Sequence, residues 1–326
     1  MIYLKKRNRK TNVPVLFCLA AIWATACGPA VKTSENPPQT PYKKVDYVHH
    51  DSVALSAYIF EPPESKSQPR KRHPAIILIH GGAWMVGTPR QHWWYAQHFS
   101  QAGYVVMAIE YRKMSEAAFP AALYDCKAAI RWLRVHADQY GIMKESIAVM
   151  GDSAGGHLAC MAALTRPEDG LEGNSNPHVS SAVQCLIALY PMTDLEKIVR
   201  PRNIMERLFK RFTLNYRLVK YLVRDMEGSL IERARKASPV QYVHPNPPPS
   251  LFIHGSLDKN VSPYQSRNLH LMLLNYAAPS EYIEVPRPHG FDYFDPNLRR
   301  EIFNRILQFL HQNLEGAPDV QLAKID

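Results

Sequence analysis

A serine stands between two glycines near the middle of the chain, in the segment Gly151-Asp152-Ser153-Ala154-Gly155. An apolar, strand-like run precedes this segment and a helix-like run follows it. In a turn from strand to helix, flanking glycines let the two elements approach closely, and the serine hydroxyl is exposed above the end of the strand. The pattern predicts that Ser153 is a nucleophile. The alternative is a glycine-rich helix start that binds phosphate.

A serine hydroxyl is a weak nucleophile and needs a neighbouring base. Downstream, Asp258 follows the strand-like run LFIHGS, and His289 follows the strand-like run YIEV. The chain order is therefore serine, acid, histidine, and all three residues stand where strands end. We expect His289 to accept the proton of Ser153, and Asp258 to hold the imidazole in the reactive tautomer.

Other residues in the same loops are rivals for these roles. Asp194 follows the preceding predicted strand and is the best alternative acid. His254 stands before the acid, which is the wrong order for the base. Asp292 and Asp295 lie shortly after His289. The joint placement of a serine, an acid and a histidine at three strand ends favours the first assignment.

Two further glycines follow an earlier apolar run, in the segment HGGAW at residues 80–84. Glycines there let backbone N–H groups turn toward the site. With the N–H of Ala154, they would bind the oxygen that becomes negative during acyl transfer. We expect Gly81 and Gly82 to supply these donors. Because Ala83 replaces the last glycine of the simplest pattern, the pair Gly82 and Ala83 is the alternative.

The first and last residues of that segment carry functional side chains of their own. We expect His80 to brace the loop rather than to transfer protons. Trp84 either lines the substrate site or shields the loop from water. The aromatic run HWWY at residues 92–95 either stacks on a ring of the substrate or, in the favoured interpretation, is the packed start of the next helix.

Strands and helices alternate along the chain, which predicts a mainly parallel sheet with helices on both of its faces. The first two strands, at 43–50 and 53–60, are expected to form a hairpin. A near-continuous apolar run such as HPAIILIH is typical of a strand buried on both faces. Further strands are expected at 73–80, 104–111, 146–150, 182–190, 250–255 and 281–285, and helices at 120–140, 153–164, 263–276 and 296–314.

The segment from Leu195 to Lys236 interrupts this alternation with a helix-like sequence. Between Glu196 and Lys236 it carries twelve basic and five acidic residues, mixed with leucine, phenylalanine and tyrosine. It is either a peripheral insertion whose basic face is solvated or a surface that contacts anionic lipid, and the first interpretation is favoured. A position near the site entrance is also expected, because insertions at the carboxyl ends of strands lie there.

Five segments together resemble the α/β-hydrolase superfamily: HGGAW, EYR at residues 110–112, GDSAGGHLA, GSLDKNVS and PHGF. They are similar to its hormone-sensitive-lipase and carboxylesterase branches, including bacterial esterases related to feruloyl and acetylxylan esterases. The resemblance covers about residues 45–312. It implies a cofactor-free serine hydrolase of carboxylic esters that forms an acyl-enzyme. Its expected substrates are acyl or feruloyl esters of carbohydrates, or other small esters.

The resemblance leaves two alternatives open. The HGGxW form also occurs in related formamidases, so an arylformamidase-like or peptidase-like amidase is the first. The second, more remote, is a non-catalytic binding protein on the same scaffold; such proteins usually lose a triad member, whereas this chain has all three. The expected organisation is a catalytic domain at 43–314 with a helical insertion at about 195–236, followed by a tail at 315–326.

The N-terminal region has the features of an export signal. The basic run KKRNRK precedes the apolar stretch VPVLFCLAAIWATA, which is too short to span a bilayer comfortably. Small residues before Cys27 resemble a bacterial lipobox, with Ala24 where leucine is usual. We expect a signal peptide at 1–26, lipidation of Cys27 and a disordered tether at 27–42. The protein would then be a membrane-anchored lipoprotein of the periplasm or cell surface; simple secretion and an uncleaved anchor are the alternatives.

The formal net charge of +10 is concentrated in the N-terminal run and in the 195–236 segment. The remainder is slightly acidic, so a small-molecule ester and a membrane, but not nucleic acid, are the expected partners. Cys126, Cys160 and Cys185 lie on apolar segments and are expected to be buried thiols. No set of cysteines and histidines has the spacing of a metal site, so neither a metal nor a cofactor is expected.

Overall fold

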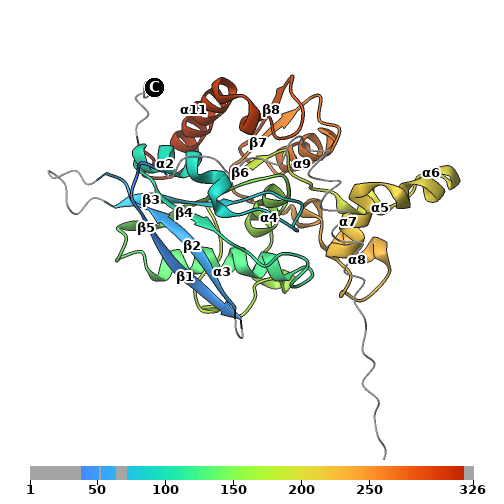
Figure 1. Ribbon diagram of the computed structural model, residues 1–326, viewed down its shortest axis with the longest axis horizontal. Helices are drawn as coiled ribbons and strands as arrows, with labels where there is room; N and C mark the ends of the chain where they lie inside the picture. Colours follow the sequence, from blue (N-terminus) through green and yellow to red (C-terminus); the bar gives the residue numbers. More distant parts are fainter. Residues whose placement is uncertain (1–37, 51–52, 64–71, 319–326) are drawn as a thin grey trace, which may run out of the picture.

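Eight strands form one mixed sheet in the computed structural model, which describes residues 38–50, 53–63 and 72–318 (Figure 1). The expected signal peptide, Cys27 and most of the expected tether and tail lie outside these residues. The strands are β1 (Tyr42–His50), β2 (Val53–Phe60), β3 (His73–Ile79), β4 (Val105–Ile109), β5 (Ile142–Asp152), β6 (Cys185–Leu189), β7 (Ser250–Gly255) and β8 (Ser280–Val285). Their order across the sheet is β1-β2-β4-β3-β5-β6-β7-β8.

The sheet is parallel over most of its width. Strands β1 and β2 form the predicted antiparallel hairpin, and β2 runs antiparallel to β4. Every other neighbouring pair is parallel. The carboxyl ends of β3 to β8 therefore meet at one edge, where the ligand sites of open α/β sheets lie.

The central strands are buried on both faces, as their continuous apolar sequences predict. Along β3, Ile76 and Leu78 belong to one apolar cluster, whereas Ile77 and Ile79 belong to the other. This alternation follows from the two-residue period of a strand, which points successive side chains to opposite faces. Two cores therefore form, one on each side of the sheet, and each needs a layer of helices to cover it.

Helices supply both layers, which confirms the predicted fold class (Figure 1). One face is covered by α2 (Trp93–Gln101) and α11 (Pro296–Asn313), and the other by α3 (Ala121–Val135), α4 (Ser153–Leu164) and α9 (Tyr264–Leu274). Helix α10 spans Phe291–Phe294, and short 3-10 helices lie at Pro89–His92, Pro167–Asp169, Lys210–Phe212 and Pro239–Tyr242. Among the described residues, Cys126, Cys160 and Cys185 are free and buried, as expected.

Four short helices lie between β6 and β7, in the segment that interrupts the sequence pattern. They are α5 (Leu195–Val199), α6 (Ile204–Phe209), α7 (Leu214–Leu222) and α8 (Leu230–Lys236). In Figure 1 they gather at one end of the molecule, and α6 extends farthest from the sheet. No helix in the described ranges is long and apolar enough to cross a membrane.

Two boundaries differ from their predictions by four residues or more. Strand β5 begins at Ile142 rather than near residue 146, because Ile142 pairs with His73 across an irregularity in the β3–β5 ladder. Helix α3 ends at Val135 rather than near residue 140. The residues after it form turns that close with Gly141 at a φ of 62°, and these turns lead directly into β5.

Candidate active site

Ser153, His289 and Asp258 meet at the carboxyl edge of the sheet. The Ser153 hydroxyl donates to His289 Nε2 at 3.0 Å, and His289 Nδ1–H donates to Asp258 Oδ2 at 2.6 Å. Ser153 directly follows β5, Asp258 lies in the loop after β7, and His289 lies in the loop after β8. The structure thus brings together the three residues that the sequence analysis selected, in a geometry suited to proton transfer from the hydroxyl to the imidazole.

The surroundings of Asp258 keep it ionised despite its burial. Burial by itself would raise the pKa of Asp258, but hydrogen bonds from His254 and His289, the electrostatic effect of His289 and the N–H of Val261 hold that pKa well below its usual value. The Asp258 Oδ1 atom accepts from the N–H groups of Asn260 and Val261, each at 2.8 Å. The carboxylate is therefore fixed in position and stays negative beside the imidazole.

His254, a rival base in the sequence, also contacts Asp258. Its Nε2 atom is 3.0 Å from the carbonyl oxygen of Val261 and 3.3 Å from Asp258 Oδ2. Because a carbonyl can only accept, Nε2 carries the proton, and Nδ1 accepts from the Ser266 hydroxyl at 2.7 Å. This fully buried histidine positions the acid and has no access to Ser153 in this arrangement.

Two of the rival acids, Asp194 and Asp295, cap helices instead of contacting His289. Asp194 Oδ1 caps α5 by accepting from the N–H of Lys197 at 2.9 Å. Asp295 caps α11 in the same way, through the N–H of Leu298 at 3.1 Å. Neither carboxylate is the partner of the His289 ring, which donates to Asp258 instead.

The turn at Ser153 requires its glycines. Ser153 has a φ of 51°, a left-handed conformation that costs about 1 kcal/mol or more for a residue with a side chain. A Cβ atom on Gly155 would lie 2.0 Å from the carbonyl oxygen of Ile79, and one on Gly151 would lie 2.3 Å from that of Gly155. The close approach of α4 to β3 and β5 explains the G-x-S-x-G spacing.

The loop at residues 80–84, which we call the oxyanion loop, differs from the first expectation in one N–H donor. The N–H of Gly81 donates to Asp152 Oδ1 at 2.8 Å, so it is not directed to a substrate oxygen. In the described part of the chain, the N–H groups of Gly82 and Ala83 meet no acceptor. The N–H of Ala154 lies in the first turn of α4, where N–H groups have no partner within the helix. The geometry therefore favours the alternative pair, Gly82 and Ala83, together with Ala154.

The loop also explains why its second glycine is needed. Gly82 has a φ of 116°, and a Cβ atom there would lie 2.1 Å from the carbonyl oxygen of Val86. The Gly82 carbonyl accepts from the N–H groups of Met85 and Val86, each at 3.0 Å. These bonds close a tight turn that carries Ala83 through a φ of 54°. The N–H groups of the loop are thereby held in place before a substrate arrives, which is the condition for strong stabilisation of a developing charge.

Comparisons with known proteins agree with this geometry. The BD-FAE family model matches residues 59–273, which is more than half of the chain. The chain belongs to the BD-FAE family. It is 31% identical over 277 residues to esterase LipC of Mycobacterium tuberculosis, covering 82% of this chain and 66% of LipC. It is also 31% identical over 144 residues to mouse hormone-sensitive lipase, covering 44% of this chain and 18% of that protein.

Solved structures place this BD-FAE protein among the α/β-hydrolase esterases. Thermogutta terrifontis esterase 2 with bound butyrate has a TM-score of 0.70 and is 28% identical, covering 86% of this chain and 97% of that one. The expected superfamily, in its carboxylesterase and hormone-sensitive-lipase-like branch, is confirmed. The chain spans 66% of the length of LipC and 56% of the length of esterase LipQ from the same organism.

Asp152, which the sequence analysis did not select, joins the nucleophile turn of this BD-FAE protein to the oxyanion loop. Its Oδ1 atom accepts from the Gly81 N–H and from His92 Nε2–H, each at 2.8 Å. A Cβ atom on Gly81 would lie 2.4 Å from Asp152 Oδ2, so a larger residue there would displace the Asp152 carboxylate. Gly81 and Asp152 are 71 positions apart, and only the pairing of β3 with β5 brings them together.

Trp84 is packed in the core beside this loop, which favours the interpretation that it shields the loop from water. The side chain is fully buried, and its Nε1–H donates to His157 Nδ1 at 3.2 Å. His157 Nε2–H donates in turn to the carbonyl oxygen of Ala237 at 2.8 Å. Burial lowers the pKa of His157 to about 4, so the ring is neutral and bridges the oxyanion loop, α4 and the end of the insertion.

His80 holds the oxyanion loop in place through a hydrogen bond, as expected. Its Nδ1–H donates to the Gly81 carbonyl at 2.6 Å, and its ring stacks on Tyr111 with 4.5 Å between the ring centroids. Lys113 Nζ donates to Nε2 at 2.9 Å. Burial, followed by the positive charge of Lys113, lowers the pKa of His80 well below its usual value. The ring is therefore neutral and structural.

Tyr190 packs against His289 and is itself held by Asp292. The Tyr190 ring meets the His289 ring edge to face, with 4.5 Å between the centroids. The Tyr190 hydroxyl donates to Asp292 Oδ1 at 2.6 Å, and the Tyr95 hydroxyl donates to Asp292 Oδ2 at 3.2 Å. The aromatic run at 92–95 is thus packed into the body of the domain, in agreement with the favoured interpretation.

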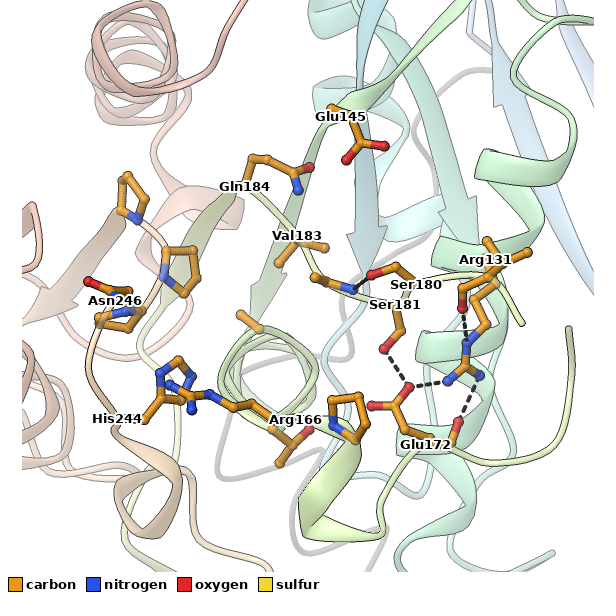
Figure 2. Close-up of a pocket in the computed structure, with 18 of the residues that line it drawn as sticks. Arg131, Glu145, Arg166, Glu172, Ser180, Ser181, Val183, Gln184, His244 and Asn246 are labelled. Carbon is orange, nitrogen blue, oxygen red and sulfur yellow. Dashed lines mark hydrogen bonds and ion pairs between the residues drawn. The ribbon is translucent and has the colours of Figure 1, made fainter. Parts of the chain in front are cut away.

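A cavity of about 810 Å³ lies away from the triad (Figure 2). It is lined by Glu145, Gln184 and Pro249, which stand near the amino ends of β5, β6 and β7. Arg131 and Glu172 form an ion pair at its wall. This cavity is therefore at the opposite edge of the sheet from Ser153. Among the described residues, no group of three or more His, Cys, Asp or Glu side chains is arranged to hold a metal ion.

Proposed function

We propose that the protein is a serine hydrolase of carboxylic esters, with Ser153 as nucleophile, His289 as general base and Asp258 as the acid that orients it. The continuous chain of hydrogen bonds from Ser153 through His289 to Asp258 is the observation that carries this proposal. The similarity to esterases along most of the chain supports the same class of reaction.

The geometry accounts for both halves of the reaction. His289 Nε2 takes the hydroxyl proton while Ser153 Oγ attacks the ester carbonyl carbon. The carbonyl oxygen becomes negative and is bound by the N–H groups of Gly82, Ala83 and Ala154; one such donor contributes roughly 10²- to 10³-fold to the rate. His289 then gives the proton to the departing alcohol, which leaves Ser153 acylated. Water, activated by the same imidazole, releases the acid.

We propose short acyl esters as the preferred substrates. Thermogutta terrifontis esterase 2, to which the chain is 27–28% identical, has been solved with bound propionate and with bound butyrate. The p-nitrophenyl esters of acetate, butyrate and octanoate test acyl length. We expect the highest kcat/KM for acetate or butyrate, and a preference for octanoate would contradict the proposal. Acetylated and feruloylated sugars in the same screen test a carbohydrate ester as the natural substrate.

The proposed location is outside the cytoplasm, on a lipid anchor. This proposal is supported by the sequence around Cys27, which lies outside the described residues. The catalytic domain would then be attached to a membrane of the periplasm or cell surface and would act on esters at that boundary.

Covalent labelling tests the reaction class. Paraoxon phosphorylates Thermogutta terrifontis esterase 2, and we expect paraoxon or a fluorophosphonate probe to label this chain at Ser153. Ser153→Ala should abolish labelling and ester turnover without changing the unfolding transition. Ser262→Ala, at an exposed serine of the Asp258 loop, is the matched control and should be labelled like the native chain. Labelling that persists in Ser153→Ala would remove this residue from the mechanism.

The amidase alternative needs a separate measurement, because the same triad can cleave amides. Turnover of p-nitrophenyl butyrate and of N-formylkynurenine by the same preparation distinguishes the two. We expect the ester to have the larger kcat/KM. The reverse ranking would assign the chain to arylformamide hydrolysis.

A further inference from the structure

Five large apolar side chains lie exposed on one side of α6 and of the 3-10 helix that follows it. We call this set the α6 face. Its members and their exposed fractions are Ile204 (76%), Met205 (57%), Leu208 (48%), Phe209 (63%) and Phe212 (70%). Positions spaced by one, four, five and eight residues lie on one side of a helix, so these side chains form a contiguous patch. Contiguous exposed apolar patches of this kind mark interaction sites.

Helix α6 is oriented opposite to an ordinary amphipathic helix. Its polar side faces the domain: Lys210 Nζ donates to the carbonyl oxygens of Lys197 and Arg200, at 2.8 and 2.6 Å. The side chains of Glu206 and Lys210 are only 25% and 18% exposed. A surface helix normally buries its apolar side against the core. Here the apolar side faces solvent, which points to a partner outside the domain.

Positive charge flanks the α6 face. Arg202 pairs with Glu206 at 2.8 Å, whereas Arg207 and Arg211 meet no carboxylate within the described ranges. The Arg211 guanidinium lies 5.1 Å from the centroid of the Phe212 ring, which places charge beside the apolar patch. The wider segment from 196 to 236 carries the surplus of basic residues already described. This combination of exposed apolar side chains and basic flanks is typical of helices that lie in the interface of an anionic membrane.

The α6 face is connected to the catalytic loops. Asn215 Nδ2 of α7 donates to the Asn260 carbonyl at 2.6 Å, and the Asn260 N–H donates to Asp258. The residues that line a groove of about 750 Å³ include Met205 and Phe209 of the α6 face and Lys259 and Asn260 of the Asp258 loop. A membrane bound at the α6 face would therefore lie beside the loop of the catalytic acid.

We propose that the α6 face docks on the surface of an anionic lipid bilayer. The apolar side chains enter the boundary of the acyl region, and Arg207 and Arg211 meet lipid phosphates. A second copy of the chain fits this surface less well, because pairing two α6 faces would bring their unpaired arginines together. The proposal does not depend on the hydrolase activity, since it rests only on exposure, orientation and charge.

Local insertion of the α6 face can be measured in the full chain. Phe209→Trp and Phe212→Trp place reporters on the face, and Tyr276→Trp replaces an exposed aromatic residue elsewhere as the matched control. Vesicles of phosphatidylglycerol and dibrominated phosphatidylcholine quench tryptophans that enter the bilayer. After subtraction of the native signal, we expect at least two-fold stronger quenching at 209 and 212 than at 276. Equal quenching at the three positions, or none at 209 and 212, would overturn the proposal.

Affinity gives an independent readout. We expect the double variant Phe209→Ser with Phe212→Ser to partition at least ten-fold more weakly into phosphatidylglycerol vesicles, because two aromatic contacts are lost. Removing two arginines, by Arg207→Gln with Arg211→Gln, should weaken partitioning by more than ten-fold, since each basic residue near an anionic surface contributes roughly five-fold. Leu271→Ser with Leu274→Ser, at exposed leucines of α9, is the control and should partition like the native chain.

Two further results decide the interpretation. Turnover of a soluble p-nitrophenyl ester should be unchanged in the α6 variants, which shows that they are folded. If the α6 variants bind vesicles as well as the α9 control, the proposal is wrong. If the native chain dimerises without lipid and the α6 variants do not, the face is an interface between copies, and the membrane proposal is also overturned.

Discussion

Asp258 and Asp292 are both buried carboxylates, and their surroundings move their pKa values in opposite directions. Burial raises the pKa of each. At Asp258 the hydrogen bonds from His254 and His289 outweigh burial and lower the pKa. At Asp292 the nearby charge of Asp152 adds to burial, and the pKa rises to about 6. In the proposed mechanism Asp258 must stay negative beside the His289 imidazole, and it is the carboxylate that is surrounded by donors.

Exchange of the acid for its amide tests this assignment. We expect Asp258→Asn to lower kcat by roughly 10³- to 10⁴-fold, because an asparagine cannot hold the His289 tautomer in the same way. Asp194→Asn is the matched control and should change kcat less than three-fold, since asparagine also caps a helix well. Steady-state kinetics on p-nitrophenyl butyrate measure both. A larger loss in Asp194→Asn would reassign the acid.

The raised pKa of Asp292 predicts a pH dependence of stability. The native chain binds a proton at Asp292 below about pH 6, whereas the unfolded chain does so only below about pH 4. Between these values the native state holds more protons, so this group's contribution to the free energy of unfolding falls as pH rises. Asp292→Asn removes this pH-dependent loss of stability, and the amide oxygen still accepts from the Tyr190 hydroxyl.

Urea unfolding at pH 4.5 and pH 7.5 measures the effect. The quantity to compare is the free energy of unfolding of Asp292→Asn minus that of the native chain. We expect this difference to be roughly 2 kcal/mol more favourable to the variant at pH 7.5 than at pH 4.5. A difference between variant and native chain that stays constant with pH would show that Asp292 is not protonated at an elevated pKa.

At the scale of elements, the distance between α4 and the sheet is set by Gly155. Its Cα packs against the backbone at the end of β3, where a Cβ atom would meet the carbonyl oxygens of Ile79 and His80 at 2.0 and 2.6 Å. Backbone atoms cannot move aside as a flexible side chain can. The strand–turn–helix unit that carries Ser153 therefore depends on this one residue for its packing.

A pair of glycine substitutions tests this packing. We expect Gly155→Ala to lower the free energy of unfolding by about 3 kcal/mol or more, because the added methyl group forces α4 away from the sheet. Gly170→Ala is the control: its φ is 69° but open space surrounds it, so only about 1 kcal/mol of backbone strain is expected. Chemical denaturation compares the two. If both variants lost the same free energy of unfolding, α4 and β3 would be able to move apart without cost, and the packing argument would be wrong.

The strands, the order of serine, acid and histidine along the chain and the glycines that flank Ser153 could be predicted because they follow from local patterns: apolar runs, turn residues and a fixed motif. The roles of Asp152 and His254 depend on contacts that no local pattern records. Asp152 meets Gly81 only after β3 and β5 pair, and that contact removes the Gly81 N–H from the expected oxyanion hole. The burial of Trp84 likewise depends on His157, which lies 73 positions away.

At the scale of the whole molecule, the two proposed membrane contacts differ in strength and position. The segment from Cys27 to the start of β1 at Tyr42 spans at most about 50 Å when extended. Lipid at Cys27 would hold the domain within that distance of the membrane, and the α6 face would then orient it. Contact through α6 includes a screened electrostatic part, so salt weakens it, whereas a covalent lipid is insensitive to salt.

This difference allows the anchor to be tested separately. We expect Cys27→Ser to release the full chain from cell membranes after a wash at about 1 M salt, where the screening length is about 3 Å. Cys18→Ser, which changes the other cysteine of the N-terminal region, should leave the chain bound. Incorporation of a labelled fatty acid should be lost in Cys27→Ser and retained in Cys18→Ser. A Cys27→Ser chain that stays with washed membranes, or still incorporates the fatty acid, would exclude Cys27 as the site of lipid attachment.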